Sequence, residues 1–166
     1  MISGVIMITI TSNKSGWVKL KKELNVGDLK ELRIGFFKED NYGIDNGNLP
    51  VALVAAWQDK GAPFVGEQHI PARPFMTQGL KSLLKSPIYT NKYKQAYSNI
   101  LLNNSTFEAE YIKISLAVVP DLQKIIDRWS TPPNAALTVA KKGVNNPLVD
   151  TGKMRDSVKA KVSDSK

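Results

Sequence analysis

The sequence predicts an α+β fold, in which a small mixed or antiparallel sheet packs against several helices. Its 166 residues lie within the range of about 100–200 residues that is typical of one domain. Apolar residues make up 42% and charged residues 23% of the chain, an ordinary globular composition. Short β-branched runs lie near both ends of the chain, and between them apolar residues recur at the helical spacing of three and four. We therefore expect one domain over residues 1–166, with helices from its middle packed on the sheet.

The N-terminal part predicts a strand, a helix and a second strand. Val5–Thr11 is rich in β-branched residues, which favour strands. The apolar residues of Asn13–Leu24 recur at helical spacing, with lysines on the other face. Leu32–Phe37 is expected to be a largely buried strand. The polar stretch 38–48, full of Asn, Asp and Gly, predicts a turn or loop.

The middle of the chain predicts a series of helices. Val51–Lys60 follows Pro50, which suits a first helical turn, and precedes Gly61, where a left-handed cap is expected. A loop with prolines and glycine comes next, and helical spacing resumes at Phe75. A further helix is expected over Lys92–Leu102.

The C-terminal third predicts two helices, a long loop, a short helix and a strand. An apolar stripe is interrupted at Pro120, and proline in a helix interior costs about 3 kcal/mol, so we divide this stripe into two helices. Ser130–Asn146 has no periodicity and contains two adjacent prolines, which predicts an extended loop. Asp150–Asp156 fits one or two helical turns. Val158–Val162 alternates apolar residues with lysine, as a solvent-facing strand does.

Residues for catalysis, cofactors or metal binding are not evident in the sequence. The single histidine, His69, lies in a proline-containing loop without a nucleophile signature, and there is no cysteine for a thiolate site. No phosphate-binding or dinucleotide-binding glycine motif is present. The run "DNYGIDNG" lacks the bidentate glutamate of a calcium loop, because Val51 occupies that position. We expect no catalytic residue, no cofactor and no metal.

The run "LVDTG" resembles the active-site signature of aspartic proteases, in which two such loops share a proton. Too little chain follows it to build the rest of such an enzyme. The favoured interpretation is structural: Asp150 or Thr151 caps a short helix that starts at Gly152.

The charge balance allows several kinds of partner. Lys and Arg total 23 against 15 for Asp and Glu, a net charge of +8. This excess fits nucleic acid, an anionic surface or an acidic protein, and fits simple solubility equally well. The basic residues cluster loosely, one group being Lys81–Lys94. No apolar run approaches the roughly 20 residues that span a membrane, and the N-terminus lacks the basic region of a signal peptide. We expect synthesis in the cytosol and no membrane association.

Three motifs in order carry a resemblance to a known family. They are "IPARPF" at Ile70–Phe75, "PPNAALTVAKKG" at Pro132–Gly143 and "PLVDTGKMRDSV" at Pro147–Val158. Together they resemble the neck and tail-completion proteins of tailed bacteriophages, over roughly residues 32–162. The resemblance implies a structural virion protein without enzymatic activity, made in the cytoplasm of the host bacterium. It implies a homo-oligomeric ring at the head–tail junction, of six subunits as first choice and twelve as second. The ring would contact other neck, connector and tail-tube proteins, with DNA as a further partner in its channel.

The proline-flanked arginine is the first interface candidate. Pro71 and Pro74 restrict the backbone around Arg73, whose guanidinium can fork onto a carboxylate or onto carbonyl groups. Two alternatives stay open: Arg73 contacts a neighbouring subunit, or it pairs within its own subunit while Phe75 fills the core. The candidate interface residues are Arg73, Phe75, Leu137, Val139, Lys142, Asp150, Thr151 and Arg155.

The long loop supplies a second expectation. Residues 130–149 are predicted to form an extended arm, mobile in the free subunit and ordered across an adjacent subunit or ring, with Leu137 and Val139 as its anchor. The alternative is a surface loop that is simply long. For the whole chain, the alternative function is a basic nucleic-acid-binding module, which salt-dependent DNA binding would identify.

Overall fold

The computed structural model describes residues 7–9, 30–65, 68–102 and 104–164. The α+β fold predicted from the sequence is confirmed. Strands β1 (Met7–Thr9), β2 (Lys30–Gly35) and β5 (Lys159–Asp164) form an antiparallel sheet in the order β1-β2-β5. The predicted helix over Asn13–Leu24 lies outside the described residues, as do the ends of the predicted first strand.

The register of the sheet fixes which side chains meet the helices. Ile34 of β2 lies opposite Ala160 of β5 and is buried together with Leu32. Successive strand residues point to opposite faces. Lys159 and Lys161 are accordingly exposed, while Ala160 is partly buried. β2 begins and ends two residues earlier than the predicted strand, and β5 begins one residue later.

Helix α2 (Val51–Lys60) has the predicted bounds. Gly61 has φ 75° but ψ 161°, so the chain leaves the helix in an extended conformation and not in the predicted left-handed cap. A Cβ at Gly61 would lie 2.9 Å from the amide nitrogen of Ala72, because the two backbone segments run close together. Glycine is therefore required here for its conformation and for its lack of a side chain.

The predicted loop after Gly61 is wrong, because an antiparallel hairpin of β3 (Ala62–Val65) and β4 (Gln68–Ile70) stands in its place. The prolines and glycine in this stretch suggested a loop. Proline is nevertheless tolerated in a strand that has a neighbour on only one side, since its missing N–H then costs no ladder bond. A two-stranded hairpin offers two such edges.

The helical layer begins with six residues of π-helix, η2 (Phe75–Leu80), followed by α3 (Lys81–Leu84) and α4 (Pro87–Leu101). α4 starts five residues before the predicted helix, because Pro87 follows Ser86 at a helix start that proline favours.

The split of the stripe at Pro120 is wrong, because α5 (Phe107–Arg128) runs through it without a break. Pro120 is exposed, so a carbonyl that loses its partner there can be hydrated. The buried stripe of α5 meanwhile continues on the opposite face, through Ile114, Val118, Leu122 and Ile126.

The connection after α5 is long, as predicted, but it contains a short helix, α6 (Ala136–Lys142). Its alanine, leucine and lysine residues favour a helix, and Gly143 ends it in the left-handed conformation with φ 75°. Seven residues are too few to show a periodic apolar stripe. The single-turn helix α7 (Lys153–Asp156) then leads into β5, and a 3-10 turn, η1 (Ile44–Asn46), lies within the predicted loop 38–48.

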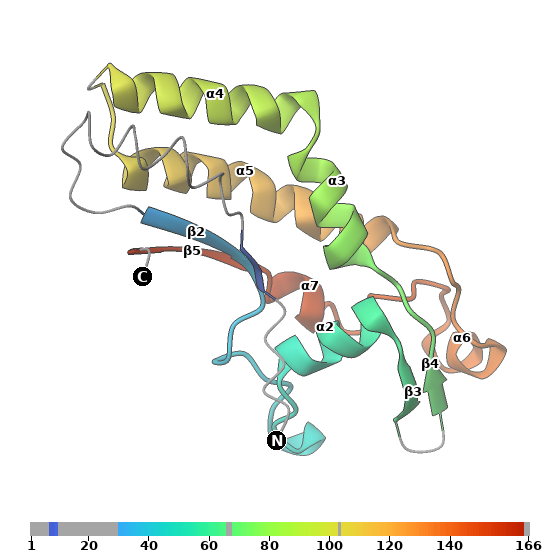
Figure 1. The fold of residues 1–166 in the computed structure, drawn as a ribbon. Helices are drawn as coiled ribbons and strands as arrows, with labels where there is room; N and C mark the ends of the chain where they lie inside the picture. Colours follow the sequence, from blue (N-terminus) through green and yellow to red (C-terminus); the bar gives the residue numbers. More distant parts are fainter. Residues whose placement is uncertain (1–6, 10–29, 66–67, 103, 165–166) are drawn as a thin grey trace.

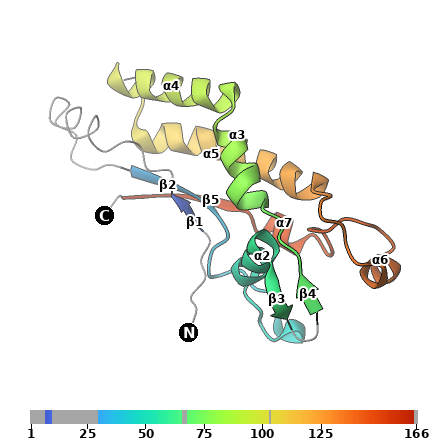
Figure 2. The same ribbon diagram turned by 45° about the vertical axis from the view of Figure 1, so that its right-hand side comes forward.

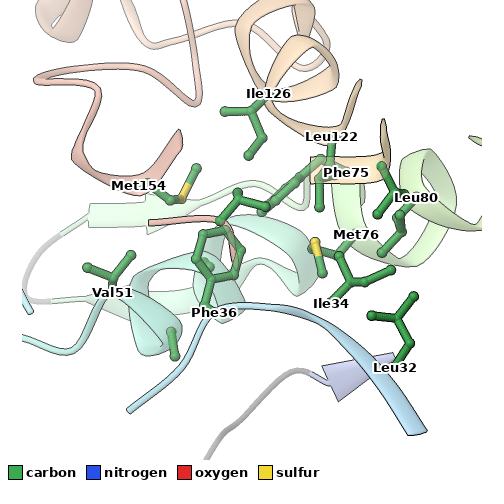
Figure 3. Packing of buried hydrophobic residues seen from close by; sticks show 14 of the residues in the cluster. Leu32, Ile34, Phe36, Val51, Phe75, Met76, Leu80, Leu122, Ile126 and Met154 are labelled. Atoms are coloured by element: carbon green, nitrogen blue, oxygen red, sulfur yellow. The ribbon is translucent and has the colours of Figure 1, made fainter. Parts of the chain in front are cut away.

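These elements stack in three layers. Figures 1 and 2 show α4 on the side of α5 that faces away from β2 and β5, with α6 projecting at one end of the molecule. Figure 3 shows the side chains of Leu122 and Ile126 on one side of Phe75 and those of Ile34 and Phe36 on the other. The rings of Phe36 and Phe75 meet edge to face, with their centroids 6.1 Å apart. The core therefore lies between β2, η2 and α5.

The described part of the chain contains neither a membrane-spanning helix nor a metal-binding cluster of side chains. No helix there has both the length and the apolar character needed to cross a membrane. No group of three or more His, Asp or Glu side chains within the same ranges comes together where it could hold a metal ion.

Candidate functional site

Arg73 joins three segments that are distant in the sequence. Its backbone N–H donates to the carbonyl of Gln58 at 2.6 Å, and Nη1 donates to Oε1 of the same residue at 2.6 Å. Nε donates to the carbonyl of Pro132 at 2.9 Å, and Nη2 donates to that of Pro133 at 3.1 Å. We call this arrangement of Arg73, Gln58, Pro132 and Pro133 the Arg73 junction. The sequence left open whether Arg73 contacts a neighbouring subunit or pairs within its own. In the structure, Arg73 pairs within its own subunit.

The charge of Arg73 is buried, so it must be compensated by hydrogen bonds within the junction. Arg73 is 4% exposed, and this desolvation lowers the pKa of its guanidinium from the usual value. A buried charge is tolerated when its hydrogen-bonding groups are satisfied. The rigid planar fork of arginine suits two adjacent carbonyl groups, which a lysine cannot match. The Pro-Ala-Arg-Pro sequence at Pro71–Pro74 therefore fixes the start of the segment 130–149 to the end of α2.

Asp59 supports the junction from the next position of α2. It is 2% exposed, and its Oδ1 accepts the backbone N–H groups of Met76 at 2.7 Å and Thr77 at 3.1 Å. This carboxylate therefore caps the start of η2. Asp59 was not among the site residues predicted from the sequence. The available signal was a negative charge in the last turn of a helix, where the helix dipole disfavours it, which suggests a role outside that helix.

The segment 130–149 is folded back on itself by amide side chains. The Asn134 N–H donates to Oδ1 of Asn145 at 3.0 Å, and the Asn134 side chain donates to the carbonyl of Asn146 at 3.2 Å. Asn146 in turn donates to the carbonyl of Asp127 at 2.9 Å, which ties the segment to the end of α5. None of these amide residues was singled out in the sequence, since isolated asparagines there indicate only loops.

Lys142 closes the same segment at its other end. Its Nζ donates to the carbonyl of Asn146 at 2.8 Å and to that of Val149 at 2.5 Å. Lys142, Asp150 and Thr151, three of the interface candidates, line one pocket of about 100 Å³ between Tyr42 and Met154. The structure thus brings together candidates that the sequence could only list.

Helix α6 is the exposed part of the segment. Within the described chain, none of its residues is buried, and Leu137 is 79% exposed. Val139 is half-buried, and Val144, just beyond the helix, is 58% exposed. Of the two apolar side chains that the sequence marked as an anchor, Leu137 therefore faces solvent, and Val139 is only partly covered in the single chain.

The residues of "LVDTG" lead into α7 as a structural turn. α7 starts at Lys153, one residue after the predicted Gly152, which adopts the left-handed conformation at φ 80°. Oγ1 of Thr151 accepts the N–H of Lys153 at 3.3 Å, so Thr151 provides the expected bond to the helix start. Asp150 is exposed, and its charge adds to the burial that raises the pKa of Tyr42.

Two of the remaining interface candidates make contacts within their own chain. Phe75 is fully buried, so it fills the core. Arg155 binds Asp156 at 2.7 Å and Asp127 at 3.3 Å, which together raise the pKa of its guanidinium. The candidates with side chains exposed to solvent are Leu137, Asp150 and Thr151.

No family model, no curated protein and no solved structure matches this chain. Its function is therefore inferred from the geometry of the site and from the resemblance carried by the quoted motifs.

Proposed function

We propose that the protein is a structural component of a tailed-phage virion. It forms a homo-oligomeric ring at the head–tail junction, where it completes the tail and joins it to the head. The three motifs and their order support this proposal, and the carrying observation is the segment 130–149. The Arg73 junction fixes the start of this segment by backbone carbonyls, while Leu137 on its helix stays 79% exposed.

The energetics of α6 explain why we infer a neighbouring subunit. Ordering a residue costs about 1–2 kcal/mol of backbone entropy, and burial of apolar surface is the main term that offsets this cost. α6 buries none of its residues in the described subunit. An adjacent subunit that covers Leu137 and Val139 would supply the missing burial. A head-to-tail interface of this kind closes into a ring when its rotation closes.

The mass of the assembled protein tests this proposal. Native mass spectrometry of the full chain is expected to give six times the 18.3 kDa of one chain, with twelve copies as the second choice. A protein that stays monomeric up to the highest soluble concentration, and when mixed with phage tail tubes, would contradict the ring.

Hydrogen exchange tests the role of the segment separately. Amides of residues 134–146 are expected to exchange faster in the free subunit than in the assembly. The amides of the α5 core provide the internal control, since they should be protected in both states. Equal protection of 134–146 in both states would show that the segment is only a surface loop.

A further inference from the structure

The basic residues of the sheet are neutralised within the chain. Arg33 binds Glu31 at 2.7 Å and Lys159 binds Asp40 at 2.7 Å. Lys30 pairs with Asp164, and Lys161 pairs with Glu39. Each positive side chain that projects from β2 or β5 thus has a carboxylate partner, and this layer contributes little to the net charge.

The layer formed by α3 and α4 differs from the sheet because its positive charges have no carboxylate partners among the described residues. No Asp or Glu occurs between Gln68 and Phe107. Four exposed lysines lie on α3, on α4 and in the short connection between them, and none of the four forms an ion pair in the part of the chain that the structure describes. They are Lys81, Lys85, Lys92 and Lys94.

The carboxylates that α5 places against α4 do not cancel this charge. Glu110 bonds to the side chain of Asn99 and is paired with Lys113 at 2.7 Å. Asp121 accepts the hydroxyl of Tyr89 and is paired with Lys124 at 2.9 Å. Lys92 also helps to lower the pKa of Asp121, after the hydrogen bonds from Lys124 and Tyr89. Each carboxylate thus has its own lysine on α5, and the excess positive charge stays on the outer layer.

We propose that the exposed face of α3 and α4 binds the phosphate backbone of double-stranded DNA without reading its sequence. Figures 1 and 2 show that α4 is the outermost layer, so nothing in the described fold covers this face. The exposed polar side chains around the lysines are hydroxyl and amide groups of the kinds that contact phosphate and sugar. They are Ser82, Thr90, Asn91, Gln95 and Ser98.

The use of lysine and the close spacing of phosphates both favour DNA over an acidic protein. Lysine is depleted in protein–protein interfaces, whereas on DNA each lysine can neutralise a phosphate and release a counterion. α4 has 15 residues, so at about 1.5 Å per residue it extends over about 22 Å. Lys92 and Lys94 lie on α4, whereas Lys81 and Lys85 precede it. A duplex carries one charge per roughly 1.7 Å of axis, so its phosphates are spaced closely enough to meet the lysines of α4 and those just before it. This inference does not depend on the proposed ring.

Fluorescence anisotropy of the full chain with a labelled 20-base-pair duplex tests the proposal, measured from 50 to 200 mM salt. One variant replaces the four α3–α4 lysines by glutamine. A matched variant removes four exposed lysines from other parts of the chain, so that both variants lose the same charge. These controls are Lys38→Gln, Lys60→Gln, Lys141→Gln and Lys153→Gln.

The native chain is expected to bind two unrelated duplexes with equal affinity. The α3–α4 variant should bind at least about tenfold more weakly at 50 mM salt, and its salt slope should fall by about 3–4, since each phosphate contact contributes roughly 0.9. The matched variant should stay within about threefold of the native affinity, and circular dichroism should show both variants folded.

Equal weakening in both variants, no binding by the native chain, or a clear preference for one duplex would overturn the proposal. So would tighter binding of poly-glutamate than of the duplex, which would identify an acidic protein as the partner.

Discussion

The Arg73 junction and helix α6 are connected through the hydrogen-bonded segment 130–149, but their side chains differ in what they contact. On one side, Arg73 is 4% exposed and Phe75, Met76 and Leu80 are fully buried. On the other side, Leu137 is 79% exposed and no residue of the fully described helix α6 is buried. The chain thus orients α6 by hydrogen bonds while leaving its apolar surface uncovered. Substitutions in the first region should affect the stability of the subunit, and those in the second should affect what it binds.

The largest effect is expected for Phe75→Ala. This change removes an aromatic ring from the centre of the core, next to Phe36 at 6.1 Å. Removal of a buried phenylalanine side chain lowers the free energy of unfolding by about 3–5 kcal/mol. Urea denaturation followed by circular dichroism measures this loss. A loss below about 1 kcal/mol would mean that the core does not depend on Phe75 as the packing indicates.

The next largest effect is expected for Arg73→Ala. Hydrogen bonds from a charged group are worth about 1.5–3 kcal/mol, and the change leaves the carbonyls of Pro132 and Pro133 without this donor. The unfolding free energy should fall by this amount, and the amides of residues 134–146 should exchange faster. Arg73→Lys is the control, because it keeps the charge but cannot bind both carbonyls as a fork. Full rescue by lysine would contradict the geometric role of the guanidinium.

The sequence predicted an element best where residues that favour helix ends marked both of its boundaries. α2 has the predicted bounds because Pro50 and Gly61 mark its ends, although Gly61 ends the helix in another conformation than expected. α5 was wrongly divided, because the cost of a proline depends on which face it occupies, and Pro120 lies on the exposed face. The β3–β4 hairpin was missed because its proline and glycine are also typical of loops.

The candidate site was predictable only in part, for a related reason. The Pro-Ala-Arg-Pro sequence singled out Arg73, because restricted backbone around a charge is a local feature of the chain. Its acceptors were not predictable, since Pro132 and Pro133 lie 59 and 60 positions away. Nor was Asp59, whose role depends on the backbone of Met76 and Thr77 folding over it.

Lys142→Met is expected to have a smaller and more local effect. The change removes the ammonium group that donates to the carbonyls of Asn146 and Val149. The loss of stability should be about 1 kcal/mol, the typical net value of a hydrogen bond in a protein. Hydrogen exchange should rise between residues 140 and 150 and stay unchanged in α5. The neighbouring Lys141→Met is the matched control, because Lys141 is exposed. Similar exchange profiles for the two variants would show that Lys142 does not hold the segment closed.

The smallest effect on the subunit is expected for Leu137→Ser, which should change the unfolding free energy by no more than about 0.5 kcal/mol, as surface substitutions do. Its effect on the proposed assembly should be much larger. Covering a leucine side chain stabilises an interface by about 1.5–3 kcal/mol, and each 1.4 kcal/mol changes an equilibrium constant about tenfold. Each contact between subunits should therefore weaken by roughly ten- to hundredfold. Sedimentation velocity and thermal unfolding of the same samples measure both quantities.

Ile88→Ser is the matched control for this last prediction, because Ile88 is 66% exposed on α4, away from the arm. It removes a side chain of the same size from a surface that we assign to DNA. It should leave both the melting temperature and the assembly unchanged. A clear fall in melting temperature for Leu137→Ser alone would mean that Leu137 stabilises its own subunit. If both variants keep a stable fold and assemble like the native chain, Leu137 is not the anchor of the arm, and the exposed apolar surface of α6 is only a feature of a long loop.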